Sequence, residues 1–524
     1  MRALLMYRDR DFDVQQSRPW NETVLTQDLE LNTLLAAMAS DDRFLFEVAR
    51  AAVLCSLQND VEVVLYRQEI LKDCFANPEL IRGLYALTVE ATENTKRMWW
   101  DLSSHYPDSV LFGAVSLLDA LLEILRKLRN IAQETAGQFQ SVGFTALFST
   151  LRSELGNEYL ATIEQYLTDL KFRNGTLVSA ELGENNEGKN YMLVRPPKRE
   201  PNWFKRMLAK GPPGYTFHLD PHDEAGARIV SGMRQHGISR VAITLAQSAE
   251  HVLNFFKSLK TELAFYMGCM NLRDKLVAKG ESVCFSVPVP ANKRIHRFRG
   301  LYDVCLALHL DHKLVGNEAD ANGKSLTIIT GANQGGKSSF LRSIGVAQLM
   351  MQCGMFVGAE MFEAELCTGL FTHYKREEDA TLKSGKLDEE LVRMSEIADH
   401  ITPDSILLLN ESFAATNERE GSEIATQVVS ALTEKRIKIF FVTHLYEFAR
   451  GFFERKAEGA LFLRAERLAD GTRTFKLFEH EPLETSYGED MYREIFGEKG
   501  VREITDTGEV GLPTQDEPIR PVVS

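Results

Sequence analysis

Residues 325–338 read SLTIITGANQGGKS, and this stretch determines the fold expected for the second half of the chain. Its apolar and β-branched residues predict a strand that ends at Thr330. From Gly331 to Ser338 the residues fit the pattern G-x-x-x-x-G-K-[ST]. In that pattern the glycines let backbone N–H groups face phosphates, the lysine reaches the β- and γ-phosphates, and the last hydroxyl ligates Mg²⁺. The stretch therefore predicts a loop that binds ATP with Mg²⁺.

The segment after this loop, SSFLRSIGVAQLMMQ, has the apolar spacing of a helix. The N-terminus of such a helix adds a favourable dipole for phosphate. A chance glycine-rich turn is the alternative interpretation. A strand directly before the loop and a helix directly after it are the context that a phosphate loop requires, so they favour nucleotide binding.

Two more apolar strands follow, SILLLN at 405–410 and KIFFVTH at 438–444. Helical patterns begin near Lys337, Asp388 and Gly421, so strands and helices alternate from about residue 300 onward. This alternation predicts a parallel α/β sheet.

Three polar residues stand where the second and third of these strands end: Asn410, Glu411 and His444. Ligands of parallel sheets bind at the carboxyl edge, so we expect Glu411 to polarise the attacking water and His444 to contact the region of the γ-phosphate. Taken alone, the apolar strand is more typical of a plain core and His444 of a structural histidine. The phosphate loop makes the catalytic interpretation the better one.

The first half of the chain has a different pattern. Apolar residues recur at helical spacing over 26–105 and 108–171, and again over 239–279. Between them, GTLVSAEL and KNYMLVRP predict two strands around the turn GENNEG, and YTFHLD also resembles a strand. The sequence therefore predicts a small β-rich insertion between long helices.

Composition excludes several classes of protein. The chain has 524 residues, of which 44% are hydrophobic and 26% charged, and its net charge is −14. These values are typical of a globular protein with more than one domain. The start has no secretory pattern and no run of eighteen apolar residues occurs, so we expect no membrane partner. The seven cysteines are scattered without a C-x-x-C pair, which favours reduced thiols and a cytoplasmic location.

Four motifs together resemble the ATPase domain of the MutS family: GANQGGKSSF, NES with FAATNEREG, VTHLYEF and SYGEDMYREIFG. Asn333 and the late S-Y-G motif distinguish this set from other P-loop classes. The resemblance covers about 300–500. The residues that it implies for nucleotide binding are Gly331, Asn333, Gly335, Gly336, Lys337, Ser338 and Ser339. It implies Glu411 and His444 as catalytic residues, and Ser338 and Asn410 beside the metal; Thr416, Gly421, Thr443, Ser486, Tyr487 and Gly488 also match.

More broadly, the chain resembles a short MutS-like protein that lacks the mismatch-recognition domain. The implied fold class is mixed: an all-α core and lever region with a small β-rich, clamp-like insertion, followed by an α/β P-loop (ABC-type) ATPase domain. The implied domains are a helical core at 1–105, lever helices at 106–171, the clamp-like insertion at 172–238, returning lever helices at 239–299, the ATPase domain with C-terminal dimerisation helices at 300–500, and a flexible tail at 501–524.

The resemblance also implies a homodimer in which a signature turn of the partner completes each nucleotide site. The matching turn keeps Ser384 and Gly385, but Leu387 and Asp388 replace the expected Ser-Thr. A carboxylate facing phosphate would repel it, so Asp388 is better interpreted as a helix N-terminal cap.

Asn410 stands where the family has an aspartate. An amide oxygen still accepts a hydrogen bond from a Mg²⁺-bound water, but it lacks the negative charge. Weakened support of a metal commonly costs ~10–100-fold in affinity or activity. We therefore expect a slow ATPase.

A local basic segment contrasts with the acidic chain. Residues 189–210 contain seven Lys or Arg and one acid, with aromatic residues interleaved. Such a segment neutralises phosphates and stacks on bases, or it is merely a solvated loop, and the two interpretations are evenly balanced. The DNA-binding candidates are Lys198, Arg199, Trp203, Lys205 and Arg206.

The function expected from these features is an ATP-gated, dimeric DNA clamp that acts on DNA structure in repair or recombination, with downstream repair proteins as further partners. The alternative is a nucleotide-binding scaffold that does not hydrolyse ATP and dimerises to recruit proteins; Asn410 and Leu387 favour it. A coiled-coil chromosome-type ATPase is a third possibility, but the helical arms lack sustained heptads.

Overall fold

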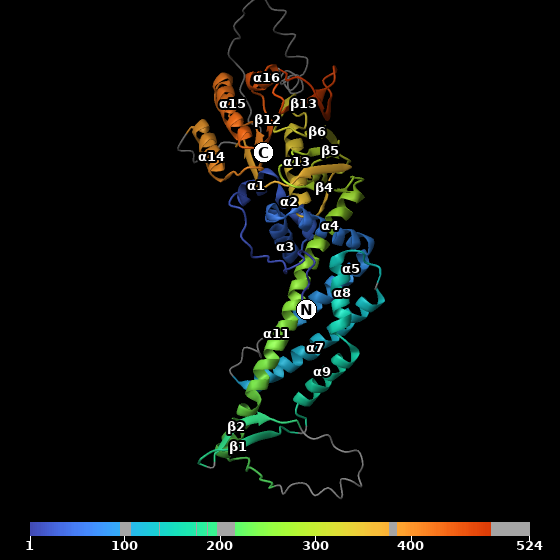
Figure 1. The fold of residues 1–524 in the computed structure, drawn as a ribbon, viewed down its shortest axis with the longest axis vertical. Coiled ribbons are helices and arrows are strands. Elements are labelled where there is room, and N and C mark those ends of the chain that lie inside the picture. The colour runs from blue at the N-terminus through green and yellow to red at the C-terminus, as the bar shows by residue number, and fades with distance from the viewer. Residues whose placement is uncertain are drawn as a thin grey trace, which may run out of the picture. The chain divides into compact units, whose positions relative to one another are not determined.

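The computed structural model describes residues 1–94, 106–135, 137–173, 175–185, 187–195, 215–376 and 385–483. These residues form two compact units (Figure 1). The first contains Met1–Pro290 with the short stretches Leu308–Asp311 and Ala347–Val357, and the second contains the rest of the described chain. The expected fold class, a helical region followed by an α/β domain, is confirmed.

The first unit is mainly helical. Its helices are α1 (Glu22–Asp28), α2 (Leu31–Ala39), α3 (Arg43–Leu54), α4 (Val61–Ala76), α5 (Pro78–Asn94), α7 (Pro107–Glu134), α8 (Val142–Glu154), α9 (Asn157–Leu170) and α11 (Glu224–Ala278). Side chains fix where several of them begin. Asp42 accepts hydrogen bonds from the N–H groups of Phe44 and Leu45 at the start of α3, and Asp60 caps α4 in the same way.

Helix α11 has 55 residues and packs along α7 and α5, α2 and α3. It begins at Glu224, earlier than the helical period near residue 239 suggests, because Asp223 caps it by accepting from the N–H of Gly226. Its first turns, up to residue 236, are mostly exposed and contain Gly226 and Gly232, so the sequence shows no buried apolar stripe that reveals a helix there. The expected strand at 215–220 is wrong, since these residues form no strand and are exposed.

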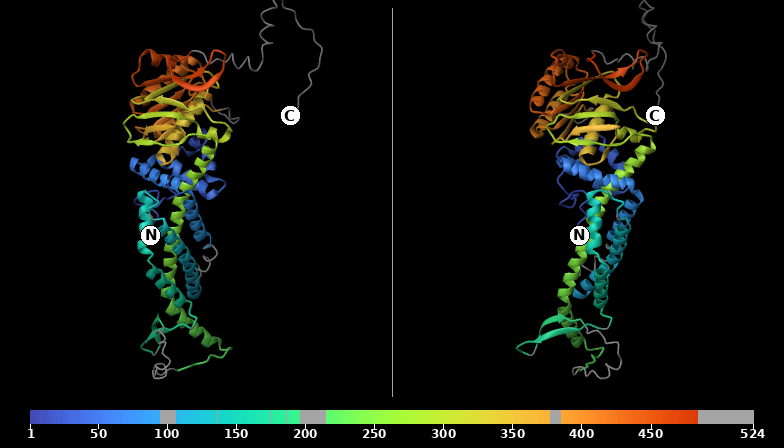
Figure 2. Two further views of the ribbon diagram at one scale, coloured as in Figure 1. Left: turned by 90° about the vertical axis from the view of Figure 1, so that its right-hand side faces the viewer. Right: turned by 45° about the vertical axis from the view of Figure 1, so that its right-hand side comes forward.

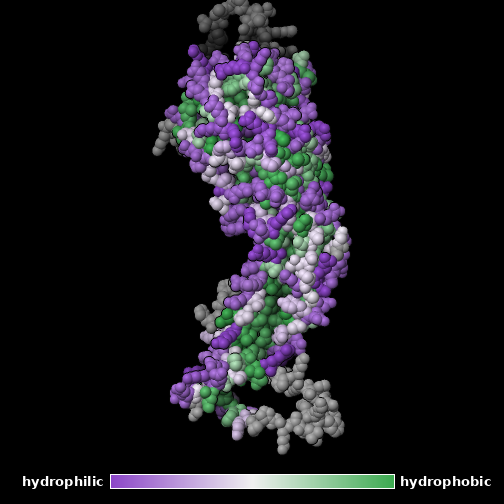
Figure 3. Space-filling model, viewed as in Figure 1, coloured by the Kyte–Doolittle hydropathy of each residue, from purple (hydrophilic) through white to green (hydrophobic). Residues whose placement is uncertain are grey.

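The two strands expected around the GENNEG turn are confirmed. β1 (Val178–Leu182) pairs antiparallel with β2 (Gly188–Leu193), and most residues of this hairpin are exposed. Short strands β3 (Cys284–Phe285) and β8 (Phe356–Val357) also pair antiparallel, and β4 (Val287–Val289) follows β3. Figure 3 shows apolar residues gathered over α11 and α7, where a groove of about 720 Å³ is lined mainly by side chains of α9 and α11, with Leu118 of α7. No helix in the described part of the chain is long and apolar enough to cross a bilayer.

The second unit contains a six-stranded sheet in the order β10-β11-β12-β7-β13-β14. Its strands are β7 (Leu326–Gly331), β10 (Leu370–Tyr374), β11 (Ile406–Asn410), β12 (Lys438–Val442), β13 (Ala460–Arg467) and β14 (Arg473–Glu479). All neighbours pair in parallel except β14, which runs antiparallel at the edge. The three strands expected from the sequence are therefore confirmed, and β12 lies between the other two.

Helices and a smaller sheet surround this central sheet (Figure 2). The helices are α12 (Val304–His309), α13 (Lys337–Gln352), α14 (Lys386–His400), α15 (Glu418–Glu434) and α16 (Tyr446–Glu454), and β5 (His296–Leu301) pairs antiparallel with both β6 (Asn317–Asp320) and β9 (Met361–Glu365). Alternate residues of the strands, such as Leu409 and Phe441, pack with α14, α15 and α16. The intervening Phe440 packs on His296 of β5, so both faces of the sheet are buried, as parallel sheets require.

Candidate nucleotide-binding site

The loop between β7 and α13 needs its glycines. Gly331 has φ +112° and Gly336 has φ +83°, a conformation that other residues rarely adopt. A Cβ on Gly335 would come within 2.9 Å of the Ala332 carbonyl oxygen and of the Ala465 Cβ. Side chains at these positions would strain or displace the loop, so its backbone stays free to face a ligand.

Lys337, the first residue of α13, folds back over this loop. Its Nζ donates to the carbonyl oxygens of Gly331 and Ala332, both at 2.8 Å, and the residue is only 6% exposed. Burial lowers the pKa of Lys337 to about 8; Glu411 opposes this shift and Arg473 adds to it. The amine is therefore positioned at the loop but is costly to keep charged without an anionic partner.

Ser338 and Asn410 meet although 72 positions separate them in the sequence. The Ser338 hydroxyl donates to Oδ1 of Asn410 at 3.1 Å. The strand order explains the contact, because β11 and β7 flank β12 and all three end at the same edge of the sheet. The two expected metal-side residues thus present a hydroxyl oxygen and an amide oxygen to one point.

Glu411 and His444 form the other half of the site. Nε2 of His444 lies 3.2 Å from Oε1 of Glu411, and each side chain is 33% exposed. The hydrogen bond with His444 is the main cause that holds the pKa of Glu411 below its ordinary value. Glu411 has φ +53°, and its N–H donates to the Val442 carbonyl of β12 at 2.8 Å. The carboxylate is therefore ionised, partly open to solvent and turned away from the line of its strand.

These residues fit Mg²⁺ and ATP. Magnesium prefers oxygen ligands and usually keeps several waters, which suits one hydroxyl and one amide oxygen beside open space. A glycine-rich backbone and a lysine amine suit phosphate. Among the described residues no group of three or more His, Cys, Asp or Glu side chains is placed to hold a metal by itself.

Two residues at this site have no motif by which the sequence identifies them. Arg473 of β14 donates from Nε to the Asn333 carbonyl oxygen at 2.6 Å, so an edge strand braces the phosphate loop. Phe475 of the same strand lies beside Gly336, where a Cβ would be 3.5 Å from its ring. Both come from an antiparallel strand beyond the alternating pattern, and no local spacing points to them.

A buried network behind Glu411 was also not predicted. His373 of β10 lies with Nδ1 at 2.7 Å from the Ser412 hydroxyl and with Nε2 at 3.0 Å from the Glu390 carbonyl oxygen of α14. Burial lowers the pKa of His373 to about 4, so the ring is neutral. Since a carbonyl oxygen only accepts, Nε2 donates to the Glu390 carbonyl oxygen. The Ser412 hydroxyl lies 2.7 Å from both Nδ1 and the His373 carbonyl oxygen, and its one proton goes to one of these two acceptors. The network joins α14 to the residue that follows Glu411.

The expected signature turn is only partly described. Ser384 lies outside the described residues, whereas Gly385 is the N-cap residue of α14 and makes no side-chain capping bond. The expectation that Asp388 caps this helix is wrong. It lies in the first turn, where its charge favours the positive helix end.

Other predicted residues also fall outside the described part of the chain. These are the DNA-binding candidates Lys198, Arg199, Trp203, Lys205 and Arg206, and the late motif residues Ser486, Tyr487 and Gly488.

Comparison with known proteins supports these observations independently. Residues 59–279 match the family described as MutS2 N-terminal domain, and residues 327–495 match MutS domain V. Among similar proteins is the DNA mismatch repair protein MutS of Thermus aquaticus, 38% identical over 125 residues, which are 23% of this chain and 15% of that protein. Another is the DNA mismatch repair protein MutS of Leptospira interrogans (strain Fiocruz L1-130), 27% identical over 172 residues, which are 30% of this chain and 20% of that protein. The matched stretches thus span a fifth or less of these relatives.

Proposed function

Because this chain belongs to the MutS family, with a MutS2 N-terminal domain and the ATPase domain called MutS domain V, we propose that it is a slow, Mg²⁺-dependent ATPase that works as a dimeric, ATP-gated DNA clamp. It acts on DNA structure in repair or recombination. The observation that carries the proposal is the meeting of Lys337, the Ser338–Asn410 pair and the Glu411–His444 pair at the carboxyl edge of one sheet.

Each residue has a distinct role in this proposal. The loop N–H groups and the Lys337 amine bind the phosphates, and the contacts of Lys337 with Gly331 and Ala332 hold it in place until they do. Ser338 and Asn410 hold the metal and its water. When bound, Mg²⁺ supplies charge stabilisation for the phosphate oxygens.

Glu411 accepts the proton of the attacking water. The hydrogen bond with His444 lowers its pKa, which keeps the carboxylate ionised at neutral pH but also makes it a weaker base. His444 holds one carboxylate oxygen and leaves the other available, so it acts by positioning Glu411. Asn410 supplies no negative charge beside the cation, which is the reason for a slow rate.

Two variants test the ATPase proposal. Glu411→Gln should keep nucleotide affinity and abolish phosphate release, because an amide cannot accept the proton. Lys337→Ala should lose nucleotide binding, because the phosphates lose their cationic partner. The matched control is Glu447→Gln, which removes an exposed carboxylate from the first turn of α16. Parent-rate hydrolysis by Glu411→Gln would show that the assignment of the base is wrong.

DNA binding needs its own test, because the basic segment is not described by the structure. Replacing Lys198, Arg199, Lys205 and Arg206 by glutamine should flatten the slope of log K against log salt by up to about 0.9 per lost duplex-phosphate contact. The measurement is a salt titration with duplex, branched and single-stranded DNA. An unchanged slope and affinity would show that the segment is only a solvated surface.

A scaffold that binds nucleotide without hydrolysing it remains the second candidate. The neutral Asn410 and the apolar Leu387 in the first turn of α14 favour it. Two measurements distinguish the ATPase from the scaffold: the oligomeric state with and without ATP, and the rate of phosphate release. A scaffold dimerises with ATP and releases no phosphate above the Glu411→Gln background.

A further inference from the structure

A second polar cavity lies at the opposite edge of the central sheet, where the parallel strands begin. Its volume is about 210 Å³. The residues that line it precede or start β7, β11 and β12, or lie beside β5 and β9: Asn292, Arg294, Lys324, Ser325, Glu365, Asp404, Arg436, Ile437 and Lys438. None of them belongs to the nucleotide site.

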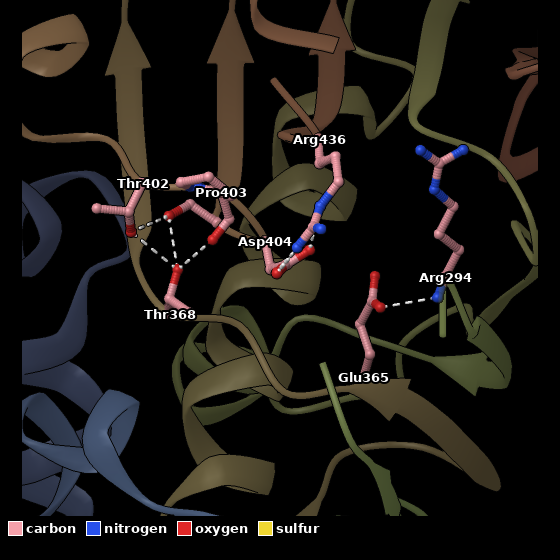
Figure 4. Close-up of polar contacts among 8 residues, drawn as sticks. Arg294, Glu365, Thr368, Thr402, Pro403, Asp404 and Arg436 are labelled. Atoms are coloured by element: carbon pink, nitrogen blue, oxygen red, sulfur yellow. Dashed lines mark hydrogen bonds and ion pairs between the residues drawn. The ribbon is translucent and has the colours of Figure 1, made fainter. Parts of the chain in front are cut away.

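The charges of this cavity do not balance. Lys438 pairs with Oε1 of Glu365 at 2.7 Å, and Arg436 forms a two-point ion pair with Asp404 (Figure 4). Both carboxylates of the lining are therefore matched by one cation each. Arg294 and Lys324 remain, and within the described chain neither of them has a carboxylate partner. The lining thus has a net charge of +2 from four cations and two carboxylates.

The Glu365 carboxylate in the lining is already occupied by other donors. Besides Lys438, Glu365 accepts the backbone N–H of Arg294 at 2.8 Å through its second oxygen. Among the described residues, the Lys324 amine donates to the Glu458 carbonyl oxygen at 2.9 Å and to no other acceptor. Figure 4 shows the guanidinium of Arg294 directed away from Glu365. The free cationic groups thus keep donors for a further ligand.

The lining is held firmly in shape. Arg294, Asp404 and Arg436 have φ of +52°, +65° and +65°, a conformation that costs energy for residues with side chains. The turn that carries Asp404 is anchored by the Thr368 hydroxyl, which donates to the Pro403 carbonyl oxygen at 2.8 Å and lies 3.0 Å from the Thr402 hydroxyl (Figure 4). The backbone on which Arg294, Asp404 and Arg436 are placed is therefore fixed by its neighbours.

We propose that this cavity is a second anion site, which binds one phosphate group. Two unpaired cations, one a planar guanidinium and one an ammonium, suit the oxygens of a phosphate. The cavity is smaller than the ~300–1,000 Å³ typical of sites for larger organic ligands, so it takes the phosphate group and not a whole nucleotide. The source is either free phosphate or a terminal phosphate of a nucleic acid.

The test removes the nucleotide site first. The melting temperature of the Lys337→Ala variant is measured at increasing concentrations of inorganic phosphate, while chloride keeps the ionic strength constant. A saturable rise of the melting temperature is expected, because a ligand that binds only the folded state stabilises it. Adding Arg294→Gln and Lys324→Gln should raise the phosphate concentration that gives half of this shift at least tenfold. Lys313→Gln, an exposed lysine of the same unit, is the matched control and should change nothing.

Two further measurements keep the outcome clear. With Lys337 intact, the Arg294→Gln and Lys324→Gln double variant should still bind ATP, which shows that it is folded. A dinucleotide with and without a 5′-phosphate separates the two sources: a shift only with the phosphorylated form assigns a nucleic-acid end, and a shift with inorganic phosphate alone assigns the free ion. Absence of any saturable shift in Lys337→Ala, or equal binding by the double variant, overturns the proposal.

Discussion

In the proposed function, Asn410 is the residue that makes ATP hydrolysis slow. Its amide oxygen receives the Ser338 hydroxyl at 3.1 Å, as a carboxylate there would, but it brings no charge to the metal. In the proposed function, Asn410 therefore keeps the hydrogen bond to Ser338 and lacks the negative charge of an aspartate.

Replacing Asn410 by aspartate should therefore raise hydrolysis. A tenfold faster rate would correspond to about 1.4 kcal/mol of barrier, and hydrolysis should reach half its maximum at lower Mg²⁺ concentration. Steady-state phosphate release across a Mg²⁺ titration measures both effects. Asn417→Asp, which adds the same charge while keeping an N-cap residue on α15, is the control.

The same titration separates two causes of slow turnover. If Asn410→Asp tightens Mg²⁺ dependence without a faster rate, the signature turn limits the reaction, and Leu387→Ser with Asp388→Thr should be needed as well. If no variant exceeds the parent rate, the slow-ATPase proposal fails and the scaffold is the better description.

Lys337 gives a pH dependence whose sign follows from its surroundings. Burial lowers its pKa to about 8 in the free protein, and bound phosphates favour the charged amine. Nucleotide binding should therefore take up a proton near pH 8, and affinity should fall by up to about tenfold per pH unit above it.

Calorimetric titration at pH 8.5 in two buffers of different ionisation enthalpy measures this proton uptake. Lys337→Arg is the control, because a guanidinium stays charged over this range. Equal heats in both buffers for the parent protein would contradict the lowered pKa.

At the scale of elements, the loop after β11 depends on α14. Glu411 and Phe413 both have left-handed backbone, with φ of +53° and +63°, and such strain persists only where neighbours fix it. Ser412 between them is bonded to His373, and the N–H groups of Phe413 and Ala415 interact with the buried Glu390 carboxylate. Helix α14 thus positions the loop that presents Glu411.

Glu390→Ala should lower the turnover number while ATP affinity stays unchanged, because it frees the loop but touches no ligand group. Glu390→Gln keeps one acceptor oxygen and should restore part of the rate. Phosphate release and equilibrium nucleotide binding are measured for both variants. Glu396→Ala, on the exposed face of α14, is the control. A loss of ATP affinity equal to the loss of rate would indicate general damage to the domain and would contradict a positioning role.

At the scale of the molecule, the N-terminal residues are fixed by a helix that lies more than two hundred positions away. Glu262 of α11 is fully buried and accepts hydrogen bonds from the N–H groups of Leu5, Met6 and Phe12. Arg67 of α4 donates to the Met6 carbonyl oxygen at 3.0 Å. The start of the chain is therefore part of the core of the first unit.

Glu262→Ala should destabilise that unit by about 3 kcal/mol or more, since three buried N–H groups lose their acceptor at ~1–3 kcal/mol each. Hydrogen exchange of residues 1–15 and thermal unfolding measure the loss. Glu250→Ala, an exposed position of the same helix, is the control. Unchanged exchange in Glu262→Ala would show that other contacts hold the segment.

The same carboxyl gives a pH dependence of stability. Burial raises the pKa of Glu262 from 4.5 to about 7. As pH rises, the folded state therefore keeps the Glu262 proton to a higher pH than the unfolded chain does. The resulting contribution to the free energy of unfolding is fully present below about pH 4.5 and is lost as pH rises through about 7. Glu262→Gln, which has no titrating proton, should flatten the dependence between these two values.

The local patterns of the sequence were sufficient for the loop over 331–338, for the three strands of the sheet and for the positions of Asn410, Glu411 and His444 at the strand ends, while the roles of these residues stay predictions. Each of these depends on residues that are neighbours in the chain: a glycine spacing, a run of β-branched residues, or a polar residue directly after a strand. The covalent order of the chain fixes such features, so the sequence displays them directly.

Only the tertiary structure decided which of these residues meet. The insertion of β12 between β7 and β11 brings Ser338 to Asn410, and the antiparallel edge strand β14 brings Arg473 to the phosphate loop. The pairing of His373 with Ser412 and the cavity at the opposite edge also join distant segments. Strand order and packing create these contacts through burial and hydrogen bonding across the whole unit, and no spacing along the chain records them.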